Sequence, residues 1–385
     1  MPDPTPTSPP ALPARVVVGG YSLGPRADDP QAGTGLRVLD LGPGDARTPP
    51  YASVGHEALP SPTWVVRHPR RPWLVSVGET SPSELVCSRL EPDGSLTVLD
   101  RRTTGGDSGC HLALVDDGRR VVVAHYGSGT LESFGLDDRG RVTGPLGRFV
   151  SRAPLGPEQD RQDGPHLHQV VLDPTRDELL VCDLGTDRVH RLRLAPDGGL
   201  AEAGPALVLP PGSGPRHLVL AGDALVVACE LSVELVVARR EAAGWRATRT
   251  VPATTATAAE RRASPAPVLP SAVVLAGDDV VVATRGVDRL GVFALNRWRG
   301  TLDALAEVSC RGHHPRDVVV ADGLVWVANQ WSDEVVALDL AAVRAGREED
   351  AVARIAVPRP ACLVLLGETP GSGGEQRSEV SCAGR

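Results

Sequence analysis

The chain contains no lysine, and all 40 of its cationic residues are arginines. Any anion-binding site must therefore be built from Arg, His or backbone N–H groups. Asp and Glu outnumber Arg by 48 to 40, the formal net charge is −8, and no basic tract stands out. Binding to nucleic acid needs concentrated positive charge, so this balance argues against a nucleic-acid partner.

Long hydrophobic runs are also lacking. No stretch reaches the roughly 18 apolar residues of a membrane span, so no membrane association is expected. The Pro-rich residues 1–14 have neither a charged nor an apolar region typical of a signal peptide, which predicts a cytoplasmic protein. We expect residues 1–14 and the Gly/Ser/Glu-rich residues 367–385 to be disordered, with one folded domain over 15–366.

Several catalytic motifs are missing too. The chain has no GxSxG elbow, P-loop or HExxH motif, and Ser128 between two glycines is interpreted as a turn residue rather than a nucleophile. The seven cysteines form no CxxC pair and are interpreted as small buried hydrophobes. We therefore predict no metal and no cofactor. The cysteines are Cys87, Cys110, Cys182, Cys229, Cys310, Cys362 and Cys382.

What the chain does contain is a repeat. A Pro, Gly or His is followed by a short apolar run, a turn, a second run of the form V-x-V-A-polar, and a third strand. Successive units open 45 to 57 residues apart, a period typical of a β-propeller. No long amphipathic segment separates the strands, which excludes an αβ repeat; one short helix is expected at Leu340–Glu348. The units open at Trp64, His111, His168, His217, Ala272, Asp317 and Cys362.

Seven openings predict an all-β, seven-bladed β-propeller, but the last unit stops after one strand. Arg15–Tyr21 matches the second strand of the unit and Gly35–Leu41 matches the third. We therefore expect the N- and C-terminal segments to share the closing blade, which also removes free sheet edges. A monomer is expected.

The polar residue that ends each V-x-V-A run is the first candidate for a site. Equivalent positions in a propeller lie near one end of the assembly, and most of these residues are polar or charged. Strand ends normally meet solvent, however, and Asp183 is equally well interpreted as the cap of a turn. In blade order the residues are Glu79, His125, Asp183, Glu230, Arg285, Asn329 and Gly20.

The segments that open the strands supply the second set: Gly164–Gln169 (GPHLHQ), Gly214–His217 (GPRH) and His313–Asp317 (HHPRD). His166 and His168 are two residues apart and point to the same side of a strand, and either is a candidate acid or base. Such an HxH pair also suits a metal by ligand type, but no third ligand is clearly spaced and nearby arginines would repel a cation. From the residues alone, the starts of the first strands and the ends of the second strands need not lie at the same mouth of the channel.

These segments resemble the bacterial lactonase family of seven-bladed propellers. GPHLHQVVLDP with LLVCDLGTDRV, GPRHLVL with ACELS, ATRGVDRLGVFAL and HPRDVVV with VANQWSDEV are each similar to a blade of that family, over about residues 15–366. The family includes propeller-type 6-phosphogluconolactonases and carboxymuconate lactonising enzymes. The sequence departs from the usual Asn at three positions, where it has His125, Cys229 and Thr284.

The resemblance implies a lactone hydrolase that converts 6-phospho-D-glucono-1,5-lactone to 6-phosphogluconate in the pentose phosphate pathway. It implies that the two sets of residues converge, with a small anionic lactone as ligand. The expected catalytic residues are His168, Glu230 and His166. The expected substrate-binding residues are Arg216, Arg285, Arg316, His217, His125 and Asn329.

Two other classes remain open. One is a cycloisomerase or a lactonase for another carboxylated lactone of the muconate type, which would need the same arginines. The other is a non-catalytic propeller that binds a ligand or a protein, since the fold alone does not decide function.

Overall fold

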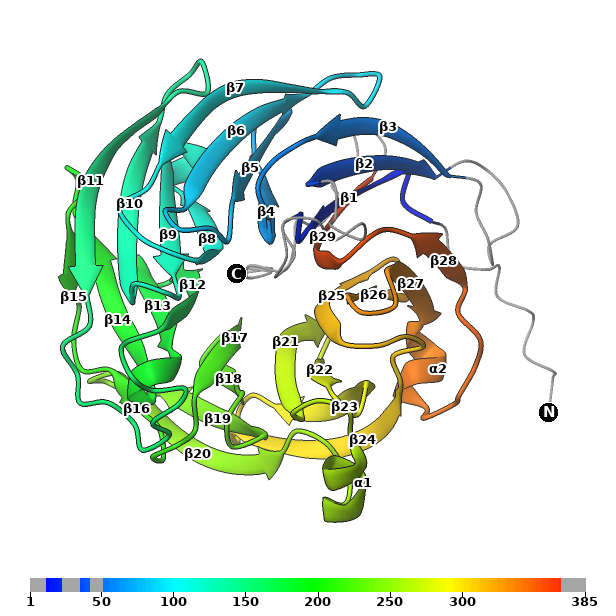
Figure 1. The fold of residues 1–385 in the computed structure, drawn as a ribbon. Coiled ribbons are helices and arrows are strands. Elements are labelled where there is room, and N and C mark those ends of the chain that lie inside the picture. Colours follow the sequence, from blue (N-terminus) through cyan, green and yellow to red (C-terminus); the bar gives the residue numbers. More distant parts are fainter. Residues whose placement is uncertain (1–11, 23–34, 42–50, 368–385) are drawn as a thin grey trace.

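The Val-rich runs form the strands of a ring of sheets (Figure 1). The computed structural model describes residues 12–22, 35–41 and 51–367. Most of the two terminal segments expected to be disordered, and Cys382, lie outside these ranges. The described residues form seven antiparallel sheets, which confirms the predicted seven-bladed propeller.

In blades 1 to 6 the first four strands pair in chain order, and the first strand lies at the channel. Blade 1 comprises β4 (Trp64–Arg67), β5 (Trp73–Val77), β6 (Glu84–Leu90) and β7 (Leu96–Thr103). Blade 2 comprises β8 (Gly109–Val115), β9 (Arg120–His125), β10 (Thr130–Leu136) and β11 (Val142–Val150). Blade 3 comprises β12 (Leu167–Asp173), β13 (Glu178–Asp183), β14 (Arg188–Leu194), β15 (Leu200–Glu202) and β16 (Leu207–Val208). Blade 4 comprises β17 (Pro215–Ala221), β18 (Ala224–Cys229), β19 (Glu234–Arg240) and β20 (Trp245–Pro252).

The remaining blades complete the ring. Blade 5 comprises β21 (Leu269–Ala276), β22 (Asp279–Arg285), β23 (Arg289–Asn296) and β24 (Thr301–Ser309). Blade 6 comprises β25 (Pro315–Ala321), β26 (Leu324–Asn329), β27 (Glu334–Asp339) and β28 (Ala353–Ala356). Blade 7 comprises β29 (Pro360–Leu366), β1 (Arg15–Gly20), β2 (Leu36–Leu41) and β3 (Tyr51–Glu57).

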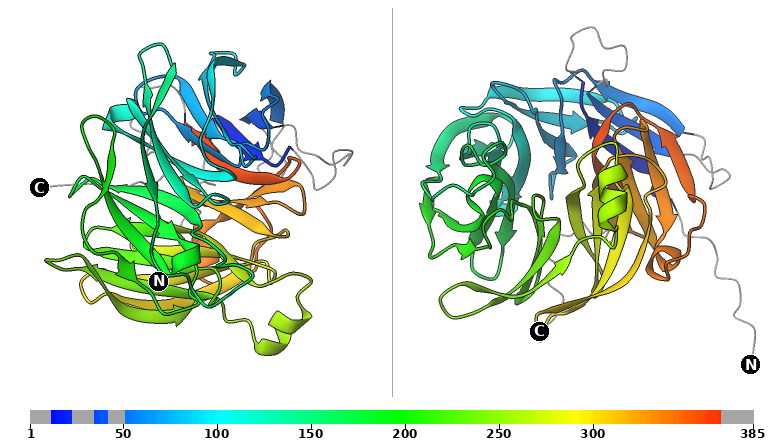
Figure 2. Two further views of the ribbon diagram at one scale, coloured as in Figure 1. Left: turned by 60° about the vertical axis from the view of Figure 1, so that its left-hand side comes forward. Right: turned by 60° about the horizontal axis from the view of Figure 1, so that its bottom comes forward.

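Blade 7 joins the two ends of the chain, as the sequence predicted. The pairing of β1 with β29 runs from Arg15 opposite Leu366 to Gly20 opposite Pro360. The first strand of every blade contacts the first strand of the next, including β29 with β4, so the ring is closed. Figure 2 shows the same ring from two further directions.

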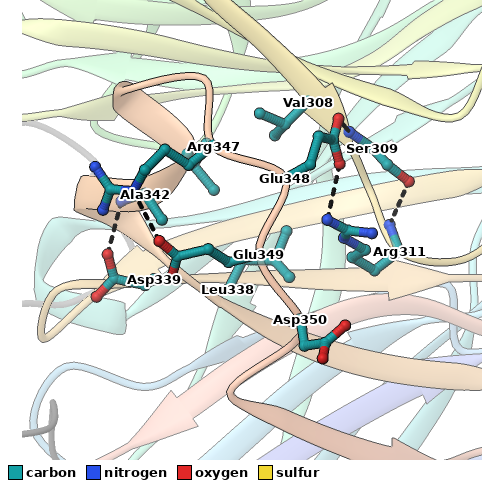
Figure 3. A pocket seen from close by; sticks show the side chains of 11 residues that line it. Val308, Ser309, Arg311, Leu338, Asp339, Ala342, Arg347, Glu348, Glu349 and Asp350 are labelled. Atoms are coloured by element: carbon teal, nitrogen blue, oxygen red, sulfur yellow. Dashed lines mark hydrogen bonds and ion pairs between the residues drawn. The ribbon is translucent and has the colours of Figure 1, made fainter.

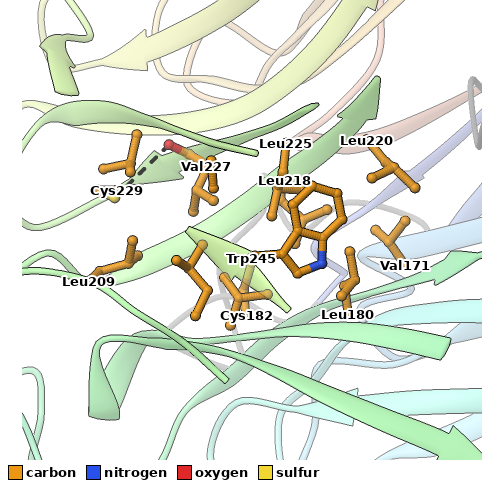
Figure 4. Close-up of a cluster of buried hydrophobic side chains, with 14 residues drawn as sticks. Val171, Leu180, Cys182, Leu209, Leu218, Leu220, Leu225, Val227, Cys229 and Trp245 are labelled. Atoms are coloured by element: carbon orange, nitrogen blue, oxygen red, sulfur yellow. Dashed lines mark hydrogen bonds between the residues drawn. The ribbon is translucent and has the colours of Figure 1, made fainter. Parts of the chain in front are cut away.

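Apolar side chains between neighbouring blades form the core. The described residues contain seven buried clusters, one at each junction; Figure 4 shows the cluster between blades 3 and 4 around Trp245. Strand β1 contributes side chains to two of these clusters, because Val16 and Val18 face blade 6 while Val17 faces blade 1. A strand buried on both faces is an unbroken apolar run, and each buried Val contributes roughly 1.5–3 kcal/mol.

Two short helices lie outside the strands of the described ranges. Helix α2 (Leu340–Arg344) begins where predicted and ends earlier. Helix α1 (Ala258–Ala263) was not expected, although Thr257 and Glu260 form a capping box that the sequence displays. No helix in the described ranges is long and apolar enough to cross a membrane.

A single methyl group at the closing junction tests this arrangement. A Cβ added at Gly19 would lie 2.3 Å from the Pro62 carbonyl oxygen of the neighbouring blade, whereas one added at Gly164 would meet nothing within 4 Å. We expect Gly19→Ala to lower the free energy of unfolding by about 1–3 kcal/mol and Gly164→Ala to leave it nearly unchanged. Denaturant unfolding measures both, and equal stability of the two variants would contradict the closure.

Candidate active site

Strand pairing places both sets of candidate residues at one rim. The first and second strands of a blade are antiparallel, so the start of one lies beside the end of the other. Pro215 pairs with Cys229 and Pro315 pairs with Asn329, for example. The openings of the first strands and the ends of the second strands therefore share a mouth, which the residues alone had left undecided.

Irregular pairing at the start of the first strands gives three candidate residues equivalent places. Leu167 pairs with Asp183 and Gln169 with Cys182, which leaves His168 as the extra residue of a β-bulge. The same shift in blades 4 and 6 leaves Arg216 and Arg316 unpaired in the ladder. Because a bulge re-aims the extra side chain, His168, Arg216 and Arg316 turn toward the same mouth.

The register corrects the alignment of the second set. In six blades the same backbone hydrogen bond marks the rim position at the end of the second strand. The residue at this position donates its backbone N–H to the carbonyl oxygen of the residue that lies two before the bulge, or two before the position equivalent to the bulge. Glu79 and Glu230 are the donors in blades 1 and 4. In blade 5, Arg285 pairs with Leu269 and takes the corresponding place one residue after Thr284. In blades 2, 3, 6 and 7 the residue at the rim position comes one residue after the residue that the repeat had predicted. The equivalent residues are Tyr21, Glu79, Tyr126, Leu184, Glu230, Arg285 and Gln330.

His125 and Asn329 therefore do not join the candidate residues at the rim. His125 is buried, with Nε2 2.8 Å from the Thr104 hydroxyl, and Asn329 donates from Nδ2 to the Cys310 carbonyl oxygen at 3.1 Å. Both lie one residue before the rim position, and successive residues of a strand face opposite sides. Cys229 and Thr284 share this register position, so all three departures from the resembled family point away from the rim cluster.

Charged side chains form a rim cluster, and the buried carboxylate of Glu230 lies at its centre. The cluster comprises Glu79, Glu230, Arg161, Arg216, Arg285 and Arg316. The Oε2 atom of Glu230 lies 2.7 Å from Nη2 of Arg285 and 3.1 Å from Nε of Arg216, and its Oε1 accepts a hydrogen bond from Nη2 of Arg161. Burial alone would raise the pKa of Glu230, but Arg285 and Arg216 outweigh it and hold that pKa well below its usual range. Glu230 is therefore ionised at any physiological pH.

Positive charge nevertheless exceeds negative charge in the cluster. Arg316 lies over the Tyr21 ring and 3.8 Å from Glu79, so four guanidinium groups face two carboxylates. Among the described residues, Nη1 of Arg216 and Nε of Arg285 are buried without a hydrogen-bond acceptor, whereas Nε of Arg216 faces Glu230. Burial, together with Arg285, lowers the pKa of Arg216 to about 9. Such a surplus of buried positive charge suits an anion that carries hydrogen-bond acceptors.

His168 and His166 differ sharply in their surroundings. Burial and then Arg216 lower the pKa of His168 well below 6.5, so its ring is neutral at pH 7. Its Nδ1 is buried with no acceptor or donor among the described residues. His166 instead has both nitrogens at 2.9 Å from acceptors, the Tyr126 carbonyl oxygen and the Asp163 carboxylate. Both ring nitrogens of His166 are therefore engaged by the protein, whereas Nδ1 of His168 is not.

Sequence reasoning missed three residues of the cluster. Tyr126 stacks on His166 at 4.4 Å between ring centroids and approaches His168 edge-on at 5.7 Å. Tyr21 donates from its hydroxyl to Glu79 at 2.7 Å. Arg161 comes from the loop before β12 and carries no repeat signal. The two tyrosines do carry one, since each follows the second strand of its blade directly.

Two other candidates lie nearby in different roles. His217 belongs to a group of rings at the channel, with centroids 5.2 Å from His168, 5.6 Å from Trp64 and 5.8 Å from His111. Asp183 accepts from the backbone N–H groups of His166 and Gly185, which supports its interpretation as a turn cap.

Features elsewhere in the described residues add no second site. Their His, Cys, Asp and Glu residues include no group of three placed to hold a metal ion. Ser128 bonds within its turn, at 3.0 Å from the Thr130 hydroxyl. A pocket between β24 and α2 is lined by charges that pair with one another, Arg311 with Glu348 and Arg347 with Glu349 (Figure 3).

Comparison with known proteins gives the family. Residues 15–365 match the model of the lactonase family described as a seven-bladed β-propeller. The chain belongs to this lactonase family. Membership of the family identifies the protein as an enzyme.

Similar proteins cover most of this lactonase-family chain. The 6-phosphogluconolactonase of Bacillus subtilis is 28% identical over 316 residues, 80% of this chain and 88% of the relative. The periplasmic gluconolactonase PpgL of Pseudomonas aeruginosa is 25% identical with a TM-score of 0.78, covering 91% of this chain and 98% of PpgL. A Lactobacillus plantarum protein, 24% identical with a TM-score of 0.76 over 91% and 99%, shares the fold.

Inorganic phosphate is a direct probe of the cluster in this lactonase-family protein. At ten times its Kd, phosphate should stabilise the wild type by about 1.4 kcal/mol. We expect His125→Asn to keep this ligand-induced shift in Tm, because His125 lies away from the cluster, and Arg216→Gln to lose it. Thermal unfolding with and without phosphate measures the shift in each variant. Loss of the shift in His125→Asn with retention in Arg216→Gln would contradict the corrected register.

Proposed function

We propose that this protein is a lactonase that hydrolyses 6-phospho-D-glucono-1,5-lactone to 6-phosphogluconate. The observation that carries the proposal is the convergence of Arg161, Arg216 and Arg285 on Glu230 beside a neutral His168. This substrate would place the reaction in the pentose phosphate pathway and the enzyme in the cytoplasm. The relative from Bacillus subtilis that bears the same activity in its name supports the choice.

The charge of the cluster fits the substrate. Four guanidinium groups against two carboxylates leave a surplus of two positive charges, and the phosphate of the lactone is a dianion near neutral pH. The buried N–H groups of Arg216 and Arg285 that lack acceptors would hold oxygen atoms of the ligand. They would also stabilise the carbonyl oxygen as it becomes an oxyanion.

The base in the proposed mechanism is His168. Its neutral ring takes a proton from a water molecule as the water oxygen attacks the lactone carbonyl carbon. The ring C–O bond then breaks while the protonated imidazole returns that proton to the leaving oxygen, which gives the acid and the free hydroxyl. Such lactones are activated esters, so positioning and a general base suffice and no covalent intermediate is needed. The role of Glu230 is then to hold the arginines in place, because its depressed pKa makes it a poor base.

Two alternatives make different demands on the same site. A lactone with a carboxylate, of the muconate type, would also use the arginines, in hydrolysis or in a cycloisomerase reaction. PpgL, named a gluconolactonase, points to an unphosphorylated sugar lactone. Turnover numbers for phosphorylated, carboxylated and neutral lactones separate these three; a non-catalytic binding propeller would turn over none of them.

Variants of the two histidines test the mechanism. With freshly generated phosphogluconolactone, and with spontaneous opening subtracted, His168→Asn should lower kcat by about 10²–10⁴. His166→Asn should have a smaller effect, because its ring is already bonded on both sides. Activity should survive EDTA, since only side chains act. Wild-type kcat in His168→Asn would remove that residue from the mechanism.

The pH profile gives an independent prediction. A base works only when it is unprotonated, so activity falls with acid as pH drops through its pKa. Because burial and Arg216 hold the pKa of His168 well below 6.5, we expect the acid limb of kcat/KM to lie well below pH 6.5. Initial rates at low pH, where spontaneous opening is slow, measure the limb. A limb at or above pH 6.5 would point to a different base.

A further inference from the structure

The loop of residues 151–166, between blades 2 and 3, carries an arginine to the rim of the cluster. The loop is fastened to blade 3: Gln162 donates from Nε2 to the Leu184 carbonyl oxygen and to Oδ1 of Asp187, both at 2.8 Å. Gly156 donates to the Gly185 carbonyl oxygen at 2.9 Å. Gln162 is itself buried, so the loop holds the neighbouring Arg161 in a fixed place.

Arg161 is the most exposed arginine of the cluster. Its side chain is 38% exposed, against 17% for Arg316, 7% for Arg285 and 4% for Arg216. A ligand arriving from solvent therefore meets Arg161 at the rim, while Arg216 and Arg285 lie beneath with Glu230.

The guanidinium of Arg161 also has unused hydrogen-bonding capacity. Its hydrogen bonds with described residues, to Glu230 and to the Tyr126 hydroxyl at 3.4 Å, are both donated by Nη2. Nε and Nη1 make none with the described part of the chain. Arg161 can therefore bind an oxyanion while it keeps its contact with Glu230, and a planar guanidinium suits a phosphate in this way.

We propose that Arg161 binds the phosphate of the substrate and makes the enzyme selective for a phosphorylated over a neutral sugar lactone. The inference rests on the proposed function. It assigns the two ends of the substrate to different arginines: the reacting carbonyl to the buried pair Arg216 and Arg285, and the phosphate to the exposed Arg161.

The test compares Arg161→Gln with Arg152→Gln. Arg152 is an exposed arginine of the same loop, and within the described ranges it has no hydrogen bond or ion pair with the cluster, so its variant removes the same charge without the same contact. A charge-assisted hydrogen bond contributes about 1.5–3 kcal/mol, so Arg161→Gln should raise KM for 6-phosphogluconolactone roughly tenfold to a hundredfold. Its KM for neutral glucono-1,5-lactone should rise far less, and Arg152→Gln should leave KM for both lactones unchanged.

A purely structural role would give a different result. If Arg161 only positions Glu230, Arg161→Gln will impair the phosphorylated and the neutral lactone equally, which would overturn the inference and leave the proposed function standing. Compared with Arg161→Gln, Arg161→Lys should keep part of the selectivity for the phosphorylated lactone. Lysine keeps the positive charge but lacks the forked N–H donors of a guanidinium group.

Binding measurements keep the two proposals separable. If the wild type hydrolyses neither lactone, the proposed function fails, and calorimetry with 6-phosphogluconate and gluconate decides the role of Arg161 by itself. A loss of about tenfold or more in affinity for 6-phosphogluconate alone, seen in Arg161→Gln and absent in Arg152→Gln, supports a phosphate contact. Equal losses for both sugar acids, or no loss, would overturn it.

Discussion

The carboxylate of Glu230 holds guanidinium groups from three distant stretches of the chain at one point. Arg161 comes from the loop between blades 2 and 3, Arg216 from blade 4 and Arg285 from blade 5. A buried carboxylate that lost these partners would be left uncompensated, at a large cost in free energy. The site therefore depends on closure of the ring, and the pairing of β1 with β29 matters to residues far from either terminus.

The same β-bulge recurs near the start of the first strand in several blades of the ring. The bulge near the start of the first strand shifts the register by one residue and turns the extra side chain toward the rim. Blades 3, 4 and 6 place His168, Arg216 and Arg316 there. Blade 2 places Cys110 at the same position, where its thiol lies 3.3 Å from the His168 carbonyl oxygen. One scaffold position thus presents an imidazole, a guanidinium or a thiol, according to the residue that occupies it.

The position one residue before the rim has the opposite character. It carries His125, Cys229, Thr284 and Asn329, all buried away from the charged cluster. The three departures from the resembled family therefore lie among buried side chains within and between blades, one residue before the charged rim positions of Glu230 and Arg285.

The sequence by itself determined the number of blades, the shared closing blade and most of the charged residues at the mouth. It could do so because apolar runs repeat with the period of the blade and polar residues interrupt them at fixed places. Only the tertiary structure decided which residues meet. The repeat locates the end of a second strand only to within one residue, and a shift of one residue moves a side chain to the other face, so Tyr126 and His125 could not be told apart in sequence. Arg161 lies in a loop outside the repeat, and nothing but the closed ring brings it to Glu230.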